Sequence, residues 1–391
     1  MNALAQLQLA ERPSKSDLAI PMARPSVGPA ELAAVNRVFE SNWLGSGPVA
    51  DRFSMRVAEE IGAAHVVAVD SGTAALHSAM TALGLGPGDE VIVPSMTFVS
   101  TIQAIVSAGA VPVFCEVLAD TMNMDVRDAE RRISPRTRAL LPVHYGGEPC
   151  DLDSVLDLAA RYRLKVVEDA AHAFGSSYKG RPIGCHGDIV CFSFDPIKNI
   201  TCGLGGAAAT NDDEIAGRLR IATNVGIDPL SVNHAGAGPQ QYAITGAGLR
   251  YRMSDVNAAI GLTQLGRMAE FRRQKLSVVE RYDQAFAAVP QVALLQRNLL
   301  ETFPFSYVIR VLDGSRDDLR QSLSEQSIGS AVQFFPNHLQ PFFARFHAEL
   351  PRTEQLFSEV VNLPLYAGLT DENVDTVIAA VQSFFGRASQ A

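Results

Sequence analysis

The stretch "HVVAVDSGTAALHSAMTALGL" (65–85) joins two kinds of apolar pattern. Residues 65–70 resemble a strand, and the continuous apolar run within them, 66–69, is typical of a strand covered on both faces. Residues 73–85 carry apolar side chains at helical spacing, and Gly72 lies at the junction. A strand followed directly by a helix is half of a βαβ unit, so this stretch predicts a mainly parallel sheet with helices on its faces.

The same alternation continues along the chain to about residue 210. Further strands are predicted at 89–94, 111–117, 138–145, 164–169 and 188–194, and helices at 98–109, 126–132 and 152–162. Successive βαβ units of this kind indicate an α/β fold with one large sheet.

The pattern changes after residue 212. Helices are predicted at 212–223, 254–287, 316–326, 353–361 and 371–385, and strands at 302–312 and 329–335. The link near 287–297 is a plausible boundary, so we expect a flexible tail at 1–20, a large domain at 21–287 and a small α/β domain at 288–391. The Gly/Ala-rich stretch "HAGAGPQQYAITGAG" (234–248) is predicted to be a mobile loop.

Composition excludes several classes of protein. The net charge of −9 argues against nucleic acid and anionic membranes as partners. No apolar run approaches the roughly 18 residues of a membrane span, and the N-terminus lacks the features of a signal peptide. The five cysteines form no CxxC pair, so we interpret them as reduced thiols of a cytoplasmic protein, and no cluster has the spacing of a metal site.

Gly72 and Thr73 open a predicted helix directly after a strand. The first amides of a helix and its dipole bind phosphate well, and a glycine lets the backbone approach a ligand closely. The alternative is an ordinary helix start in which Ser71 or Thr73 acts as the N-cap. The stretch alone leaves both interpretations open.

Two carboxylates end the strand in "VVEDAAHAFG" (166–175). Ligands of open α/β sheets bind at the carboxyl ends of strands, so Asp169 could hold a positively charged ring nitrogen there. Alternatively, Asp169 is a helix cap and His172 is a structural histidine.

Lys198 follows the predicted strand 188–194, and Ser193 lies five residues before Lys198, near the end of that strand. A buried lysine can form a Schiff base with a carbonyl cofactor, although a loop lysine is more often a solvated charge. The following "GLGGAA" (203–208) matches a dinucleotide fingerprint formally, but a strand rather than a helix follows it, which argues against that motif.

Phosphate loop, carboxylate, serine and lysine occur in this order, each at a strand terminus. Pyridoxal 5'-phosphate requires phosphate donors, an acidic partner for its ring nitrogen and a Schiff-base lysine. The combination therefore predicts a pyridoxal phosphate site more strongly than any single part.

The chain also resembles the nucleotide-sugar aminotransferases of the DegT/StrS type, a branch of the fold-type I pyridoxal phosphate enzymes, from about Ile20 to Phe385. The resemblance is carried by "WLGSGP" (43–48), "VAVDSGTAAL" (67–76), "GDEVIVPSMTFVSTIQAI" (88–105), "PVHYGGEPCDLD" (142–153), "VEDAAHAFGSSYKGRPIGCHGDIVCFSFDPIKNIT" (167–201), "YRMSDVNAAIGLTQL" (251–265) and "PNHLQPFF" (336–343).

The resemblance implies a fold and a set of roles. The fold would be a large domain with a mainly parallel seven-stranded sheet between helices, plus a small C-terminal α/β domain. Lys198 would form the Schiff base and Asp169 would pair with the ring nitrogen. The remaining roles are phosphate binding by Gly72, Thr73 and Ser193, stacking on the ring by Phe98, a place beside the ring for His172, and a place near the substrate for His338.

The resemblance further implies a homodimer in which the residue at position 250 reaches the phosphate of the partner's cofactor. The family often has asparagine there, whereas this chain has Arg250, which can also contact phosphate. Leu204 replaces a common glutamate.

The expected reaction is transfer of an amino group, from L-glutamate, to a keto group of a nucleotide-linked deoxysugar. "KNITCGLGG" (198–206) is more similar to enzymes that act at sugar C4 than to those that act at C3. The alternatives are a pyridoxamine-dependent deoxysugar dehydratase, in which histidine typically replaces the lysine, and a catalytically silent regulator with the same fold.

Overall fold

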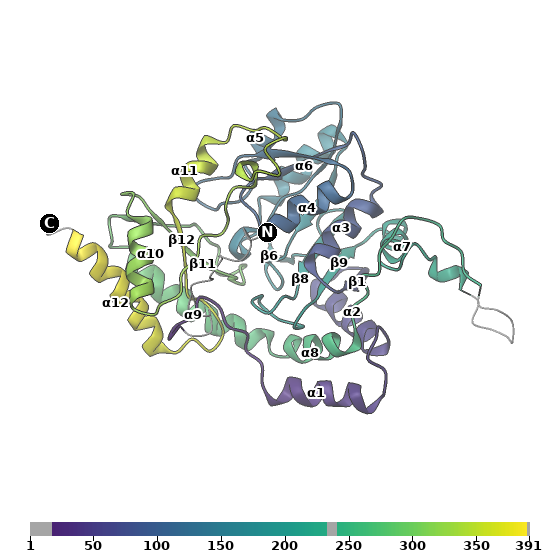
Figure 1. Cartoon of the computed structure of the whole chain (residues 1–391), viewed down its shortest axis with the longest axis horizontal. Helices are drawn as coiled ribbons and strands as arrows, with labels where there is room; N and C mark the ends of the chain where they lie inside the picture. The colour runs from purple at the N-terminus through teal and green to yellow at the C-terminus, as the bar shows by residue number, and fades with distance from the viewer. Residues whose placement is uncertain (1–17, 233–240, 389–391) are drawn as a thin grey trace, which may run out of the picture.

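The computed structural model describes residues 18–232 and 241–388 (Figure 1). Its central feature is a seven-stranded sheet with the strand order β1-β9-β8-β5-β4-β2-β3. The strands are β1 (His65–Val69), β2 (Glu90–Pro94), β3 (Val111–Cys115), β4 (Thr137–Leu140), β5 (Lys165–Asp169), β8 (Ile189–Ser193) and β9 (Gly206–Thr210). Only β9 runs against its neighbours. The predicted fold class, with a mainly parallel seven-stranded sheet, is confirmed.

Helices cover both faces of this sheet. One face carries α3 (Gly72–Ala82), α4 (Val99–Ser107) and α7 (Asp213–Ala222), and the other carries α2 (Pro48–Ile61), α5 (Val126–Arg131), α6 (Leu152–Tyr162) and α8 (Asp255–Leu265). The side chains of β8 alternate between the two layers: Ile189 and Cys191 pack in the α3 layer, whereas Val190 and Phe192 pack in the α2 layer. Burial on both faces explains why the strands are continuously apolar.

A second, antiparallel sheet contains β10 (Val292–Leu294), β11 (Tyr307–Val311) and β12 (Val360–Leu363). It shares an apolar core with α10 (Arg316–Glu325), α12 (Asp371–Ala388) and the second half of α9 (Met268–Phe286). In Figure 1, α10 and α12 lie on the opposite side of the molecule from α7. Ile20 also joins this core and pairs with Ile328. The domain boundary at 287/288 stays a prediction.

Several predicted elements differ from the structure, and the strands expected at 138–145 and 302–312 are shorter, as β4 and β11. The helix expected at 254–287 is two helices, α8 and α9, separated at Gly266 and Arg267. The strand expected at 329–335 is only a single bridge between Ala331 and Asn362, because the Gln333 amide donates to the Asn362 side chain instead of continuing a ladder. The helix expected at 353–361 is α11 (Pro351–Glu359), which ends where β12 begins.

Other expectations are only partly covered by the described residues. The tail expected at 1–20 lies outside them up to residue 17, and so do residues 234–240 of the predicted mobile loop. All five cysteines are free thiols, and only Cys185 is not buried. Among the helices of the described part of the chain, none combines the length and the apolar character that crossing a membrane requires.

Candidate active site

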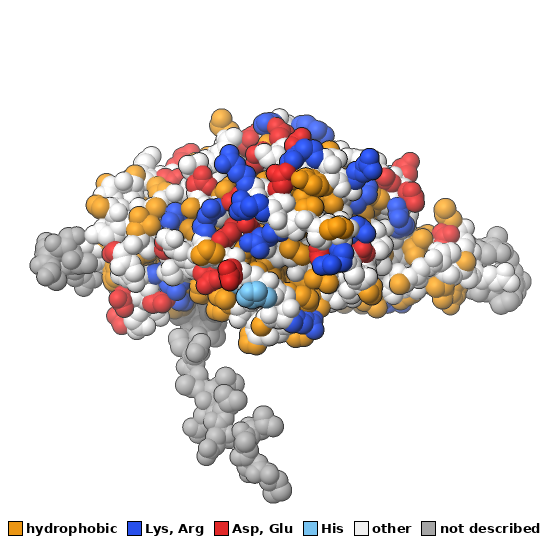
Figure 2. Space-filling view, turned by 90° about the horizontal axis from the view of Figure 1, so that it is seen from above, with side chains coloured by type: hydrophobic (Ala, Val, Ile, Leu, Met, Phe, Trp, Pro, Cys, Tyr) orange, Lys and Arg blue, Asp and Glu red, His pale blue; other side chains and the backbone are white. Residues whose placement is uncertain are grey.

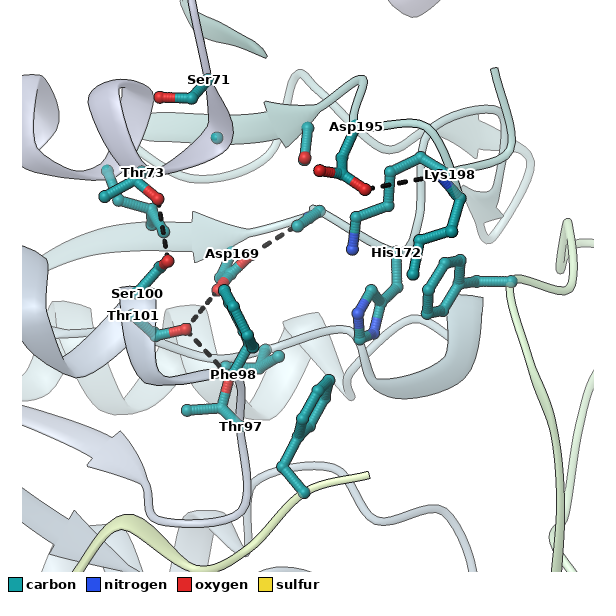
Figure 3. A pocket seen from close by; sticks show the side chains of 18 of the residues that line it. Ser71, Thr73, Thr97, Phe98, Ser100, Thr101, Asp169, His172, Asp195 and Lys198 are labelled. Carbon is teal, nitrogen blue, oxygen red and sulfur yellow. Dashed lines mark hydrogen bonds between the residues drawn. The ribbon is translucent and has the colours of Figure 1, made fainter. Parts of the chain in front are cut away.

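A cavity lies at the carboxyl ends of the central strands, where α3 and α4 begin (Figure 3). β5 ends in Asp169 and β8 ends in Ser193, and the loops that follow these strands supply His172 and Lys198. The structure therefore brings together seven of the sequence-predicted residues in one cavity. They are Gly72, Thr73, Phe98, Asp169, His172, Ser193 and Lys198.

The start of α3 is held tightly against the end of β8. A Cβ atom on Gly72 would lie 2.8 Å from Ser193 Cβ, so only glycine allows this approach. Ser71 is the N-cap, since its hydroxyl accepts a hydrogen bond from the Ala74 amide at 3.2 Å. Capping by Ser71 leaves the amides of Gly72 and Thr73 without a partner inside the helix. The interpretation of Ser71 as the N-cap is confirmed, and it leaves the first amides available for an anion, so phosphate binding by this stretch stays a prediction.

Asp169 is buried and its carboxylate has a fixed orientation. Thr101 Oγ1 donates to Asp169 Oδ2 at 2.7 Å, and the Ala171 amide donates to Oδ1 at 3.1 Å. Thr97 Oγ1 lies 2.9 Å from Thr101 Oγ1, so two threonines support the carboxylate (Figure 3). Asp169 is 4% exposed, and such a carboxylate favours a cationic partner in the cavity.

Lys198 extends into the same cavity (Figure 3). Its Nζ atom lies 4.4 Å from the centroid of the Phe305 ring. Burial lowers the pKa of Lys198 to about 8, although the carboxylates of Asp169 and Asp195 favour its charged form. A lysine with this pKa has an appreciable fraction of free amine near neutral pH, which a nucleophile and proton carrier requires.

His172 is packed between aromatic rings. Its imidazole stacks on Phe305 with centroids 4.0 Å apart, and on Phe334 at 5.8 Å. Burial and, secondly, the charge of Lys198 lower the pKa of His172 well below its usual range, so the ring is neutral. Its Nδ1 atom is buried and has no hydrogen-bond partner among the residues that the structure describes. An unpaired polar atom at a cavity wall suits a ligand that brings the missing partner.

Phe98 is the N-cap residue of α4 and is 54% exposed, which is unusual for so large an apolar side chain. It lies beside the cavity, with its ring centroid 5.8 Å from that of Phe334. An exposed aromatic face at the mouth of a polar cavity fits a planar ring as its partner.

Two predicted site residues lie elsewhere. Arg250 is exposed, and its bridge to Asn224 places it outside the cavity of its own chain. His338 is buried, with Nδ1 2.7 Å from Ser95 Oγ and Nε2 3.2 Å from Glu354 Oε1. It does not line the cavity, and both ring nitrogens are engaged, so its predicted contact with the substrate has no support from its position.

Sequence reasoning did not identify several residues that complete the cavity. Thr97 and Thr101 have a weak signal, since they flank the predicted start of α4. Phe305, Gln333 and Phe334 come from the C-terminal part of the chain, where no motif marks them. Their contribution depends on tertiary packing, which brings loops of the second sheet over the cavity.

The residues fit pyridoxal 5'-phosphate by their chemistry. The start of α3 and Ser193 suit the phosphate, the supported carboxylate of Asp169 suits the ring nitrogen, and Lys198 suits the aldehyde carbon. The exposed face of Phe98 and the unpaired Nδ1 of His172 provide further contacts for the ring.

The lowered pKa of Lys198 predicts the pH dependence of its reactivity. In the cofactor-free protein, Lys198 should react with an amine reagent with a midpoint near pH 8. An exposed lysine such as Lys179, whose pKa the ion pair with Asp153 raises, should react only at higher pH. The measurement is peptide mass spectrometry of labelling rates between pH 6 and about pH 11, a range that spans the usual lysine pKa. A Lys198 midpoint at or above that of Lys179 would contradict the prediction.

The lowered pKa of Lys198 also makes the free energy of unfolding depend on pH. The folded-state pKa is below the unfolded value, so the unfolded chain binds more protons between about pH 8 and pH 10.5. The Lys198 contribution to the free energy of unfolding should therefore rise with pH across this window and be constant below it.

The chain is similar over most of its length to several proteins of known structure. The chain is similar to the aminotransferase TlmJ from Streptoalloteichus hindustanus, with 35% identity, a TM-score of 0.88, and coverage of 95% of this chain and 100% of that chain. It is similar to the sugar aminotransferase CalS13 from Micromonospora echinospora, with 30% identity, a TM-score of 0.87 and coverage of 93% and 99%. The PLP form of the putative sugar aminotransferase Spr1654 from Streptococcus pneumoniae has 29% identity, a TM-score of 0.88 and coverage of 94% and 99%.

The model of the DegT/DnrJ/EryC1/StrS aminotransferase family matches residues 25–382, which is most of the chain. The matched range contains every residue of the cavity described above. The resemblance seen in the sequence is thereby confirmed, as is the prediction of an enzyme. The chain belongs to the DegT/DnrJ/EryC1/StrS aminotransferase family.

Proposed function

We propose that this protein is a pyridoxal phosphate-dependent sugar aminotransferase that transfers an amino group from L-glutamate to the C4 keto group of a nucleotide-linked deoxysugar. The observation that carries the proposal is the cavity in which the amine of Lys198, the carboxylate of Asp169 and the start of α3 converge. The solved relatives, described as sugar aminotransferases, support the class of substrate.

Different residues around the cavity would bind different parts of the cofactor. Gly72, Thr73 and Ser193 would hold its phosphate, and Phe98 would cover its ring. Asp169 would hold a proton on the ring nitrogen, with Thr101 and the Ala171 amide keeping the carboxylate in place. When bound, pyridoxal phosphate supplies an electron sink for the carbanion formed at Cα of the amino donor.

Lys198 performs two tasks in this scheme. Its neutral amine is the point of attachment for the cofactor, because burial keeps part of it unprotonated. As a free amine, Lys198 would accept the proton from Cα of the amino donor and later return a proton, as a general base and acid. Reaction with the keto-sugar uses the same amine in the reverse order.

The amino donor and the sugar position rest on sequence resemblance, mainly on "KNITCGLGG" (198–206). The test is a panel of nucleotide-linked 3-keto and 4-keto deoxysugars incubated with the enzyme and L-glutamate, followed by NMR of the products. An amino group at C4 is the expected result. A product aminated only at C3, or turnover with other amino donors but not with glutamate, would overturn the finer proposal and leave the aminotransferase class intact.

Two alternatives predict different observations. A dehydratase would remove a sugar hydroxyl without net amino transfer, and Lys198 counts against it because those enzymes typically carry histidine there. A silent regulator that binds DNA would need a basic surface. The chain has a net charge of −9, and on the face in Figure 2 basic and acidic side chains are interspersed. An enzyme should be yellow with bound cofactor and lose this colour on addition of glutamate, whereas a regulator should not.

We further propose that the active unit is a cytoplasmic homodimer, in which Arg250 reaches the phosphate of the partner's cofactor. Arg250 is exposed within one chain, and large apolar side chains near it, Leu249 and Ile244, are exposed as well. A second copy that covers this segment would bury them and place the guanidinium at the neighbouring site. The free thiols of the chain suit a reducing compartment.

Replacement of Arg250 tests the shared site. Arg250→Ala should weaken the affinity for pyridoxal phosphate by about 10- to 100-fold, the loss expected for a charge-assisted hydrogen bond, with little change in melting temperature. Arg250→Asn restores the commoner family residue and should retain most of the affinity. Equal, wild-type affinity in both variants, or an active monomer in sedimentation experiments, would exclude the shared phosphate contact.

A further inference from the structure

Lys275 is a buried lysine outside the cavity. It lies on α9 and is only 4% exposed. Its Nζ atom donates a hydrogen bond to Asn199 Oδ1 at 3.0 Å, and within residues 18–232 and 241–388 no carboxylate forms an ion pair with it. Lysine is rarely buried without an acidic partner, since removing its charge from water is costly. The role assigned to the cavity does not explain this arrangement.

The partner of Lys275 is the residue directly after Lys198. The Asn199 side chain uses its other end to bind two backbone carbonyls, because Nδ2 donates to Phe303 O at 3.1 Å and to Phe174 O at 3.4 Å. Phe174 lies two residues after His172, and Phe303 lies two residues before Phe305. One amide therefore ties together the three segments that carry Lys198, His172 and Phe305.

The direction of the Asn199 amide depends on Lys275. The two carbonyls accept hydrogen bonds only from Nδ2, so Oδ1 must face the other way, where Lys275 donates to it. Without this donor, Oδ1 would be a buried acceptor lacking a partner, and the amide could rotate. Asn199 is itself buried, so water cannot readily replace the lost donor.

Lys275 can donate its hydrogen bond to Asn199 in either protonation state. Burial and, secondly, the charge of Lys198 lower the pKa of Lys275 to about 7. A neutral amine still donates to Asn199, so Lys275 can hold the amide near neutral pH without a permanent second charge beside Lys198. The titratable groups that face Lys198 are then Asp169, Asp195, His172 and Lys275.

We propose that Lys275 is a positioning residue for Lys198. Its amine fixes the Asn199 amide, and this amide holds the Lys198 segment against the segments of His172 and Phe305. The proposal rests on the assignment of Lys198 as the point of cofactor attachment.

The test follows the attachment of added pyridoxal 5'-phosphate to the cofactor-free protein by visible absorbance and by circular dichroism of the cofactor band. The variants are Lys275→Met, Asn199→Ala and the double variant, with Arg273→Met on the exposed side of the same helix as control. Lys275→Met should slow attachment by about 10- to 100-fold, because small misplacements of a reacting group cost this much. It should also weaken the circular dichroism band, whereas Arg273→Met should match wild type.

The double variant decides whether Lys275 acts through Asn199. The double variant should be no slower than the slower single variant, because both substitutions break one link. The proposal would be overturned if the rate reductions of the two single variants multiply in the double variant. It would also be overturned if Lys275→Met attaches the cofactor at the wild-type rate with wild-type circular dichroism. If one of the two single variants does not fold, the other still tests the contact between Lys275 and Asn199. Attachment at the wild-type rate in the variant that folds would overturn the proposal. Failure of the proposed function is distinct, because wild-type protein itself would then induce no circular dichroism in the band of the added cofactor.

Discussion

Replacement of Lys198 by alanine is expected to abolish amino transfer while leaving the protein folded. In the proposed scheme, the variant loses both the amine that attaches the cofactor and the group that moves the Cα proton. General acid–base catalysis alone accounts for about 10²- to 10⁴-fold, so the combined loss of turnover should be at least about 10³-fold. The fold should survive, because Lys198 Nζ faces a cavity and its burial already disfavours the charged form. Turnover with glutamate and the keto-sugar, together with a thermal melt, checks both parts.

Lys179→Ala is the matched control for this variant. Lys179 is an exposed lysine of the neighbouring hairpin and forms an ion pair with Asp153. Exposed ion pairs contribute little to stability, so this change should leave turnover and melting temperature near wild type. The assignment of Lys198 is wrong if Lys198→Ala turns over at a rate comparable to that of Lys179→Ala, or if it still forms the visible band with pyridoxal phosphate.

Local sequence patterns carried most of the information about the central sheet. Buried parallel strands must be apolar on both faces, so runs such as Ile189–Ser193 are visible without a structure. The break between α8 and α9 was not predictable in the same way. Gly266 has an ordinary helical conformation, with φ of −65° and ψ of −16°, so neither its backbone nor a proline marks the end of α8.

Beside the second sheet, tertiary contacts prevent a strand that the sequence pattern predicts. The stretch 329–335 has the composition of a strand, but the Asn362 side chain takes up the Gln333 amide, and Phe334 turns to the cavity. The stretch lies beside β12, whose other edge pairs with β11, and Ala331 bridges Asn362 there. Propensity alone cannot show that a side-chain contact stops such a ladder after one bridge.

The same distinction applies to the site. Lys198, Asp169 and Gly72 were predictable because each follows or precedes an element whose end is visible in the sequence. Phe305 and Phe334 look like core residues until packing places them beside His172. His338 was expected near the substrate from a motif, yet Ser95 and Glu354 engage its ring, so motif position did not determine side-chain surroundings. Asn199 and Lys275 form a contact between residues 76 positions apart, which no local pattern reveals.

Replacement of Asp169 by asparagine is expected to separate cofactor binding from turnover. Asparagine has nearly the same shape, so its Oδ1 can accept from the Ala171 amide and its Nδ2 can donate to Thr101 Oγ1. The proposed phosphate contacts at the start of α3 and at Ser193 are untouched. Only the negative charge is lost, and with it the means of keeping the ring nitrogen protonated. Turnover should fall by at least about 100-fold, as when a preorganised charge-stabilising group is removed, while the affinity for pyridoxal phosphate changes much less.

Thr101→Val provides the comparison that isolates charge from orientation. Valine removes the hydrogen bond to Asp169 Oδ2 but keeps the carboxylate and the Ala171 contact. Turnover in Thr101→Val should therefore lie between that of wild type and that of Asp169→Asn. If Asp169→Asn turns over normally, the carboxylate does not hold the ring proton, and its burial beside Thr101 is structural. If Thr101→Val is as slow as Asp169→Asn although its carboxylate is intact, the orientation of Asp169 and not its charge limits the reaction. Measuring kcat and cofactor affinity for both variants on one preparation distinguishes these outcomes, because only loss of the charge predicts that Asp169→Asn is the slower enzyme.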